Sequence, residues 1–185
     1  MKSILRRLFK KSPQEFTPEL SPLTVEAIQS AESDEALQIL LSTELARVIP
    51  SDFGSYDDLA RHIQTLPVGL RAMAAVHRLD ISLTLESLKE HFANFPGFLY
   101  AEETLKGLHE LGLDDFAELF ETALTAVRPV GLYEHSRLLS SELTSQLDAL
   151  SSQMWDLKDR NGIDSLMDCW APYARKYPER VLMSN

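Results

Sequence analysis

Apolar residues recur along most of the chain at spacings of three and four positions, which is the period of an amphipathic helix. The clearest run passes through Leu37, Leu41 and Leu45. Ser33 before this run is a typical helix N-cap, and Pro50 after it ends the helix. No stretch alternates apolar and polar residues with the Val, Ile and Thr enrichment of a strand. The pattern therefore predicts an all-α fold.

The same period predicts further helices as far as Tyr177. A short helix capped by Ser55 is followed by runs separated at Pro67, at the turn of residues 95–98 and at Gly112. The helices are expected over residues 33–49, 55–66, 70–79, 85–94, 99–111, 113–127, 134–161 and 164–177, the last of them kinked near Pro172. We expect a single-domain helical bundle of about seven to eight helices.

The opening of the chain differs from the rest. Its first 11 residues hold five bases and no acid, and three of the nine prolines fall between positions 13 and 22. We therefore divide the chain into a flexible basic N-terminal tail with a proline-rich linker, residues 1–22, and a helical domain, residues 23–185. Residues 2–11 have the pattern of a short interfacial helix on anionic lipid, but a solvated basic tail fits as well, because so short a helix is marginal in water.

Charge and cysteine content narrow the class of protein. The chain has 28 acids against 18 bases, a net charge of −10, which argues against direct nucleic-acid binding by the helical domain. Cys169 is the only cysteine, so no internal disulfide forms and a cytoplasmic location is expected. Arg6 and Arg7 interrupt the first apolar stretch, so it does not resemble a signal peptide.

The motifs of catalysis and metal binding are absent from the sequence. The five histidines show no HExxH pair and no ligand spacing with Cys169. Neither the GxSxG nucleophile elbow nor a glycine-rich phosphate loop occurs. We therefore expect no enzyme activity, no catalytic residue, no metal and no cofactor.

The middle of the chain is strongly acidic. Residues 80–127 hold ten acids and two bases, and Asp114, Glu118 and Glu121 stand at i, i+4 and i+7 of one expected helix. That spacing places three carboxylates on one stripe, opposite an apolar face that includes Phe116. A solvated acidic face and a partner-binding face both fit this pattern. The candidate partner-binding residues are Glu102, Glu103, Glu110, Asp114, Asp115, Glu118 and Glu121.

Two stretches carry a family resemblance. Residues 85–124 (LESLKEHFANFPGFLYAEETLKGLHELGLDDFAELFETAL) contain a Phe-x-Asn helix end, a glycine turn, an AEE-x-L helix and an acidic helix. Residues 147–181 contain a Leu-Asp helix and a closing Tyr-Pro-Glu stop. Both resemble a bacterial all-helical domain family of largely unassigned function that includes the acidic DNA-mimic proteins. The paired glycines that usually precede the Phe-x-Asn of that family are missing here.

The resemblance implies a non-enzymatic acidic interaction protein, with a DNA mimic as its most specific form. The expected partner is then a basic DNA-binding protein, such as a transcription factor, whose DNA-binding surface the carboxylates occupy. The alternative is a structural or regulatory scaffold whose basic N-terminal tail docks on an anionic membrane or an acidic partner. The sequence also leaves open a homodimer and a weak membrane contact through the tail.

Overall fold

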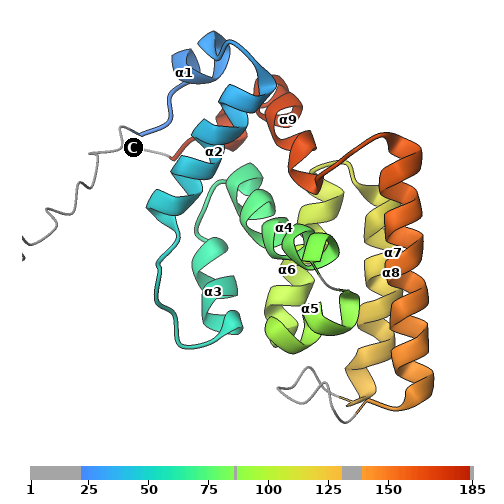
Figure 1. The fold of residues 1–185 in the computed structure, drawn as a ribbon. Coiled ribbons are helices and arrows are strands. Elements are labelled where there is room, and N and C mark those ends of the chain that lie inside the picture. Colours follow the sequence, from blue (N-terminus) through green and yellow to red (C-terminus); the bar gives the residue numbers. More distant parts are fainter. Residues whose placement is uncertain (1–21, 86, 131–138, 184–185) are drawn as a thin grey trace, which may run out of the picture.

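The computed structural model describes residues 22–85, 87–130 and 139–183, and within them it contains nine α-helices and no strand (Figure 1). This confirms the all-α prediction. The helices are α1 (Val25–Ser30), α2 (Asp34–Val48), α3 (Tyr56–Ile63), α4 (Val68–Leu85), α5 (Leu88–Asn94), α6 (Phe98–Glu110), α7 (Asp114–Val127), α8 (Ser141–Asn161) and α9 (Trp170–Lys176). Of the predicted tail and linker, residues 1–22, all but Pro22 lie outside the described residues. In the described part no helix is long and apolar enough to cross a membrane.

Helix α4 forms the centre of the molecule. Most of its residues are buried, and it packs on α6, α5 and α3, with smaller contacts to α2, α8 and α9 (Figure 1). Its closest neighbour is α6, where Gly107 allows the two backbones to approach. A Cβ at Gly107 would lie 3.0 Å from the carbonyl oxygen of Ala72. The apolar core therefore surrounds α4 on several sides rather than lying beneath one layer of helices.

Asp80 is a buried carboxylate on α4 that binds the segment before α9. It accepts hydrogen bonds from the Leu166 backbone N–H at 2.7 Å and from the Ser165 hydroxyl at 2.8 Å. The ammonium of Lys158, itself buried on α8, lies 3.9 Å from the same carboxylate. A buried charge is tolerated when it is paired and hydrogen-bonded in this way. One side chain thus joins α4, α8 and the turn at Leu166–Cys169.

Helices α7 and α8 lie side by side at one edge of the fold (Figure 1). Phe116 and Phe120 on α7 and Met154 on α8 are buried at the inner side of this pair. The Leu88 backbone N–H at the start of α5 donates to the hydroxyl of Ser151 at 2.9 Å, which fixes α5 against α8. The inner side of the pair is therefore occupied by the core, and the outer side faces solvent.

The local signals in the sequence act as predicted. The side chains of Ser33 and Ser55 accept hydrogen bonds from the backbone N–H three residues later, as helix N-caps do. Gly162 adopts the left-handed conformation, with φ of 63°, and caps the C-terminus of α8. Short polar residues and one glycine therefore set these helix ends.

Three predicted boundaries are wrong. Leu85 ends α4 with 75% of its surface exposed, instead of starting the apolar face of the next helix. Helix α8 begins at Ser141 rather than near residue 134, because Ser140 caps it; residues 131–138 lie outside the described residues. The last segment breaks before Trp170, not at Pro172, which sits in the first turn of α9 where its missing N–H costs nothing.

His91 is a buried titratable group within the aromatic core. Its ring contacts Phe92, Phe95 and Phe120, and its Nδ1 lies 3.1 Å from the hydroxyl of Ser82. Burial lowers the pKa of His91 from 6.5 to about 3, against an opposing hydrogen bond to the Arg78 backbone. The folded protein therefore holds this imidazole neutral at pH values where the unfolded chain protonates it.

The lower pKa of His91 in the folded than in the unfolded protein predicts a loss of stability in mild acid. Above pH 6.5 His91 is neutral in both states; as the pH falls from 6.5 towards 3, only the unfolded state gains the proton. The free energy of unfolding should fall by about 1.4 kcal/mol per pH unit in that window through this group. Urea unfolding at pH 7.5 and pH 5.0 should show a smaller difference for His91→Gln than for the parent. An unchanged difference would contradict the neutral assignment.

Candidate partner-binding surface

The seven acids predicted to bind a partner fall into three structural groups. Glu103 and Glu110 turn into the fold, Glu102 and Asp114 make ion pairs at the surface, and the remaining three are exposed without such pairs. The last group is Asp115, Glu118 and Glu121 on α7. The structure therefore does not bring all seven to one surface.

Glu103 is a structural carboxylate on α6. Its side chain is fully buried and accepts hydrogen bonds from Arg71, from Gln64 at 3.0 Å and from Lys106 at 3.0 Å. Burial alone would raise the pKa of Glu103, but these hydrogen bonds and the charge of Arg71 outweigh it and lower the pKa. The carboxylate stays ionised and serves to join α6 to α4, so it is not available to a partner.

Glu110 has a similar internal role at the C-terminal end of α6. It accepts a hydrogen bond from the hydroxyl of Tyr173 on α9, and Arg180 lies 2.6 Å from the same oxygen. Burial and the Glu110 carboxylate raise the pKa of Tyr173, with Arg180 opposing them, so the phenol stays protonated and donates. This contact connects α6 to the C-terminal segment.

Two of the predicted acids are paired at the surface. Glu102 lies 3.0 Å from the guanidinium of Arg128, and Asp114 lies 2.7 Å from Nδ1 of His109. All four side chains are more than 40% exposed. Exposed pairs of this kind contribute little stability and separate readily, so both carboxylates remain accessible.

The exposed side of α7 carries acids and no base. Asp115, Glu118 and Glu121 are exposed, while Phe116 and Phe120 lie buried on the opposite side of the helix. Asp115 stands in the first turn, where the helix dipole favours a negative charge. Glu118 and Glu121 have no such compensation and make no ion pair with any residue that the structure describes.

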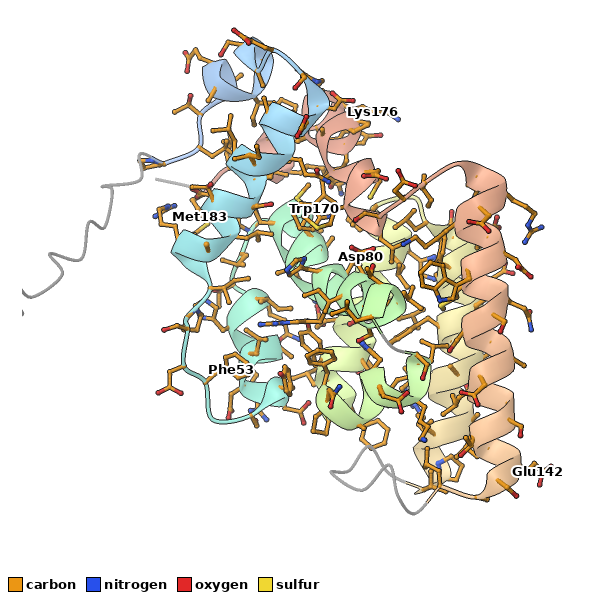
Figure 2. The ribbon with its side chains drawn as sticks, viewed as in Figure 1. Phe53, Asp80, Glu142, Trp170, Lys176 and Met183 are labelled. Carbon is orange, nitrogen blue, oxygen red and sulfur yellow. The ribbon has the colours of Figure 1, made fainter. Side chains whose placement is uncertain are left out.

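Helix α8 extends this acidic surface. Asp156 and Asp159 line an open groove of about 650 Å³ together with Asp115 and Glu118 of α7. At the other end of the two helices, Glu142 and Glu121 line a second groove of about 660 Å³ (Figure 2). The six carboxylates of the acidic hairpin face, as we name this surface, are those of Asp115, Glu118, Glu121, Glu142, Asp156 and Asp159.

Sequence reasoning missed the three acids on α8. Asp156 and Asp159 stand at i and i+3, a spacing visible in the sequence, but Lys158 and Arg160 between and after them obscured the signal. The structure separates these bases, because Lys158 is buried beside Asp80 and only Arg160 stays at the surface. Arg160 is the only exposed base on α7 and α8.

The family comparison adds an independent finding. A model of the DMP19-like protein family matches residues 64–176, more than half of the chain. The chain belongs to this DNA-mimic family. The match includes both α7 and α8, and it confirms the resemblance seen in residues 85–124 and in most of residues 147–181. Neither the curated proteins nor the solved structures contain a match for the chain.

The match leaves α1, α2 and α3 outside, since all three end before residue 64. These helices nevertheless pack on the matched part: α3 contacts α6 and α4, and α2 contacts α9. The DMP19-like part of this chain therefore carries the acidic hairpin face and is covered at one side by helices that precede it.

Because the carboxylates of the acidic hairpin face lie close together, we expect the free energy of unfolding to rise when two of them are neutralised. Glu118→Gln with Asp159→Asn should raise the free energy of unfolding by about 0.5 kcal/mol at low salt, because like charges repel and Asp159 lies near the negative end of α8. The gain should shrink at 0.5 M salt as screening increases. Urea unfolding at both salt concentrations measures it.

The matched control is Glu32→Gln with Asp52→Asn, which removes the same charge from exposed positions outside the hairpin. Equal gains in the two double variants would mean that net charge alone is responsible. A loss of stability in the hairpin variant would show that these carboxylates are satisfied in the free protein.

Proposed function

We propose that the acidic hairpin face occupies the DNA-binding surface of a basic protein in place of DNA. The observation that carries this proposal is the outer side of α7 and α8, where six carboxylates line two neighbouring grooves and Arg160 is the only exposed base. Membership of the DMP19-like family supports it. The function is binding, without catalysis, and we place it in the cytoplasm, where a lone cysteine stays reduced.

The dimensions of the surface suit this role. Asp114 and Glu121 are seven residues apart, which is about 10 Å along a helix at 1.5 Å per residue. Phosphates follow one DNA strand at about 3.4 Å of axis each, so the acids of α7 cover the length of about three phosphates. Helix α8 supplies a second row beside the first, as the second strand does across a groove.

The energetics favour many weak contacts. A single exposed ion pair contributes at most about 1 kcal/mol, so recognition depends on several carboxylates acting together. Asp114 and Glu102 add to the surface when their own pairs with His109 and Arg128 open. Glu103 and Glu110 do not take part, because Glu103 is buried and Glu110 is held by Tyr173 and Arg180.

The scaffold alternative has no structural support of its own. It depends on a basic tail within residues 1–22, nearly all of which lie outside the described residues. Homodimer formation and a membrane contact through the tail likewise remain predictions from sequence.

Charge reversal on α7 should abolish competition with DNA. Asp114→Lys, Glu118→Lys and Glu121→Lys together replace three carboxylates by ammonium groups that repel a basic surface, whereas a single substitution removes too little to be informative. The partner is first captured on the parent chain from nuclease-treated extract of the source organism and then purified. Displacement of labelled DNA from it, followed by fluorescence anisotropy, should occur with the parent and not with the triple variant.

The control reverses Glu32, Asp52 and Glu179, three exposed acids on other elements, and should compete like the parent. Competition by the parent should also weaken steeply from low to moderate salt, since screening acts on every carboxylate of the face. The proposal is wrong if the triple Lys variant, with an unchanged circular dichroism spectrum, displaces DNA as well as the parent does. It is also wrong if no DNA-binding protein is captured.

A further inference from the structure

A second site lies away from the hairpin, where α2, α3 and α4 meet the start of α9. A cavity of about 320 Å³ opens there, with walls that include Leu45 and Ile49 from α2 and its C-terminal end, and Ile63 from α3. Exposed Ala46 and Pro50 stand at its rim. Its size lies at the lower end of the range for small-molecule sites.

Two buried polar atoms beside this cavity have no hydrogen-bond partner. They are Nε1 of Trp170 and Nδ1 of His77, and both residues line the cavity. Trp170 is only 1% exposed, and Figure 2 shows it beside α2 and α4. Buried polar groups in proteins are almost always satisfied by protein, water or ligand. The indole N–H can only donate, so it needs an acceptor that the described residues do not supply.

The charge of the cavity wall is unusual for this chain. Arg78 lines the cavity, and no acid does, although the protein carries an excess of acids. The guanidinium of Arg78 stacks on the ring of Phe95, 5.8 Å from its centroid, and makes no ion pair with the part of the chain that the structure describes. Burial and the Arg78 charge lower the pKa of His77, against the charge of Asp80, so the imidazole is neutral at pH 7. The cavity is therefore lined by one cationic residue, two residues with an unpartnered nitrogen, and several aliphatic side chains.

We propose that this cavity binds a small organic monocarboxylate with an apolar body. The carboxylate accepts from the indole N–H of Trp170 and pairs with Arg78, while the body fills the space between Leu45, Ile49 and Ile63. A carboxylate oxygen would accept the hydrogen bond that the indole N–H lacks, and its negative charge would form an ion pair with the guanidinium of Arg78. The apolar body of the ligand would pack against the aliphatic side chains of the cavity wall.

The site is independent of the proposed DNA mimicry. None of the residues that line it belongs to α7 or α8. Its walls from α2 and α3 precede the segment that the family model matches, whereas His77, Arg78 and Trp170 lie within it. The cavity therefore lies between the matched segment and the helices that precede it.

Tryptophan fluorescence of the full chain reports on the site directly. The only other tryptophan, Trp155, is 40% exposed on α8, so Trp155→Phe leaves Trp170 as the single emitter. The probes are phenylacetate, 3-phenylpropionate and octanoate, each with its neutral primary amide, and binding is measured by Trp170 emission and by calorimetry in parallel. At least one carboxylate should bind with one-to-one stoichiometry and at least tenfold more tightly than its amide.

Four variants in the same background separate this site from others. Ala46→Phe at the rim should abolish binding by filling the opening, while Ala149→Phe, at an exposed position on α8, should not. Arg78→Gln should weaken the carboxylate at least tenfold and leave any amide binding unchanged, and Arg78→Lys should restore part of the loss. Absence of binding by all three acids, equal affinity for acid and amide, or full binding by a folded Ala46→Phe protein would each overturn the proposal.

Discussion

The buried carboxylate of Asp80 is the contact on which the arrangement of this fold depends. Asp80 sits near the end of the central helix α4, where it holds the turn before α9 through two hydrogen bonds and faces the buried ammonium of Lys158 on α8. Removing either charge would leave the other uncompensated in the interior, which is strongly destabilising. Together with the packing of α8 against α7 and α5, this contact holds α8 in place and with it the spacing of the acidic hairpin face.

Several acids and one base of this chain are paired inside the fold, so fewer charged side chains reach the surface than the composition suggests. Asp80, Glu103 and Glu110 belong to the acidic stretch of residues 80–127, yet all three serve the interior. Outside that stretch, Glu44 is also buried and paired with Arg47 at 2.5 Å. Lys158 is withdrawn from the outer side of α8 in the same way. The exposed acids on α7 and α8 therefore stand with only one exposed base, Arg160, among them.

The sequence predicts the local features of this protein well. Helical periodicity, serine caps and Gly162 locate most helix ends, and the i, i+4, i+7 spacing identifies the exposed stripe on α7, because each depends on neighbours within one turn. The burial of Glu103 was not predictable from its surroundings in sequence, since Arg71 stands 32 positions earlier. Asp156 and Asp159 join the surface only through the pairing of two helices, and the cavity beside Trp170 needs four elements to converge.

The central claim is that a DNA-binding protein contacts the outer side of α7 and α8. The most direct measurement is an amide chemical-shift map of isotope-labelled protein, recorded with the captured partner and again after addition of that partner's DNA. The account predicts shifts concentrated in residues 114–127 and 141–161, which disappear when DNA is added. Shifts confined to α1–α3, or shifts at the hairpin that persist in the presence of saturating DNA, would contradict it.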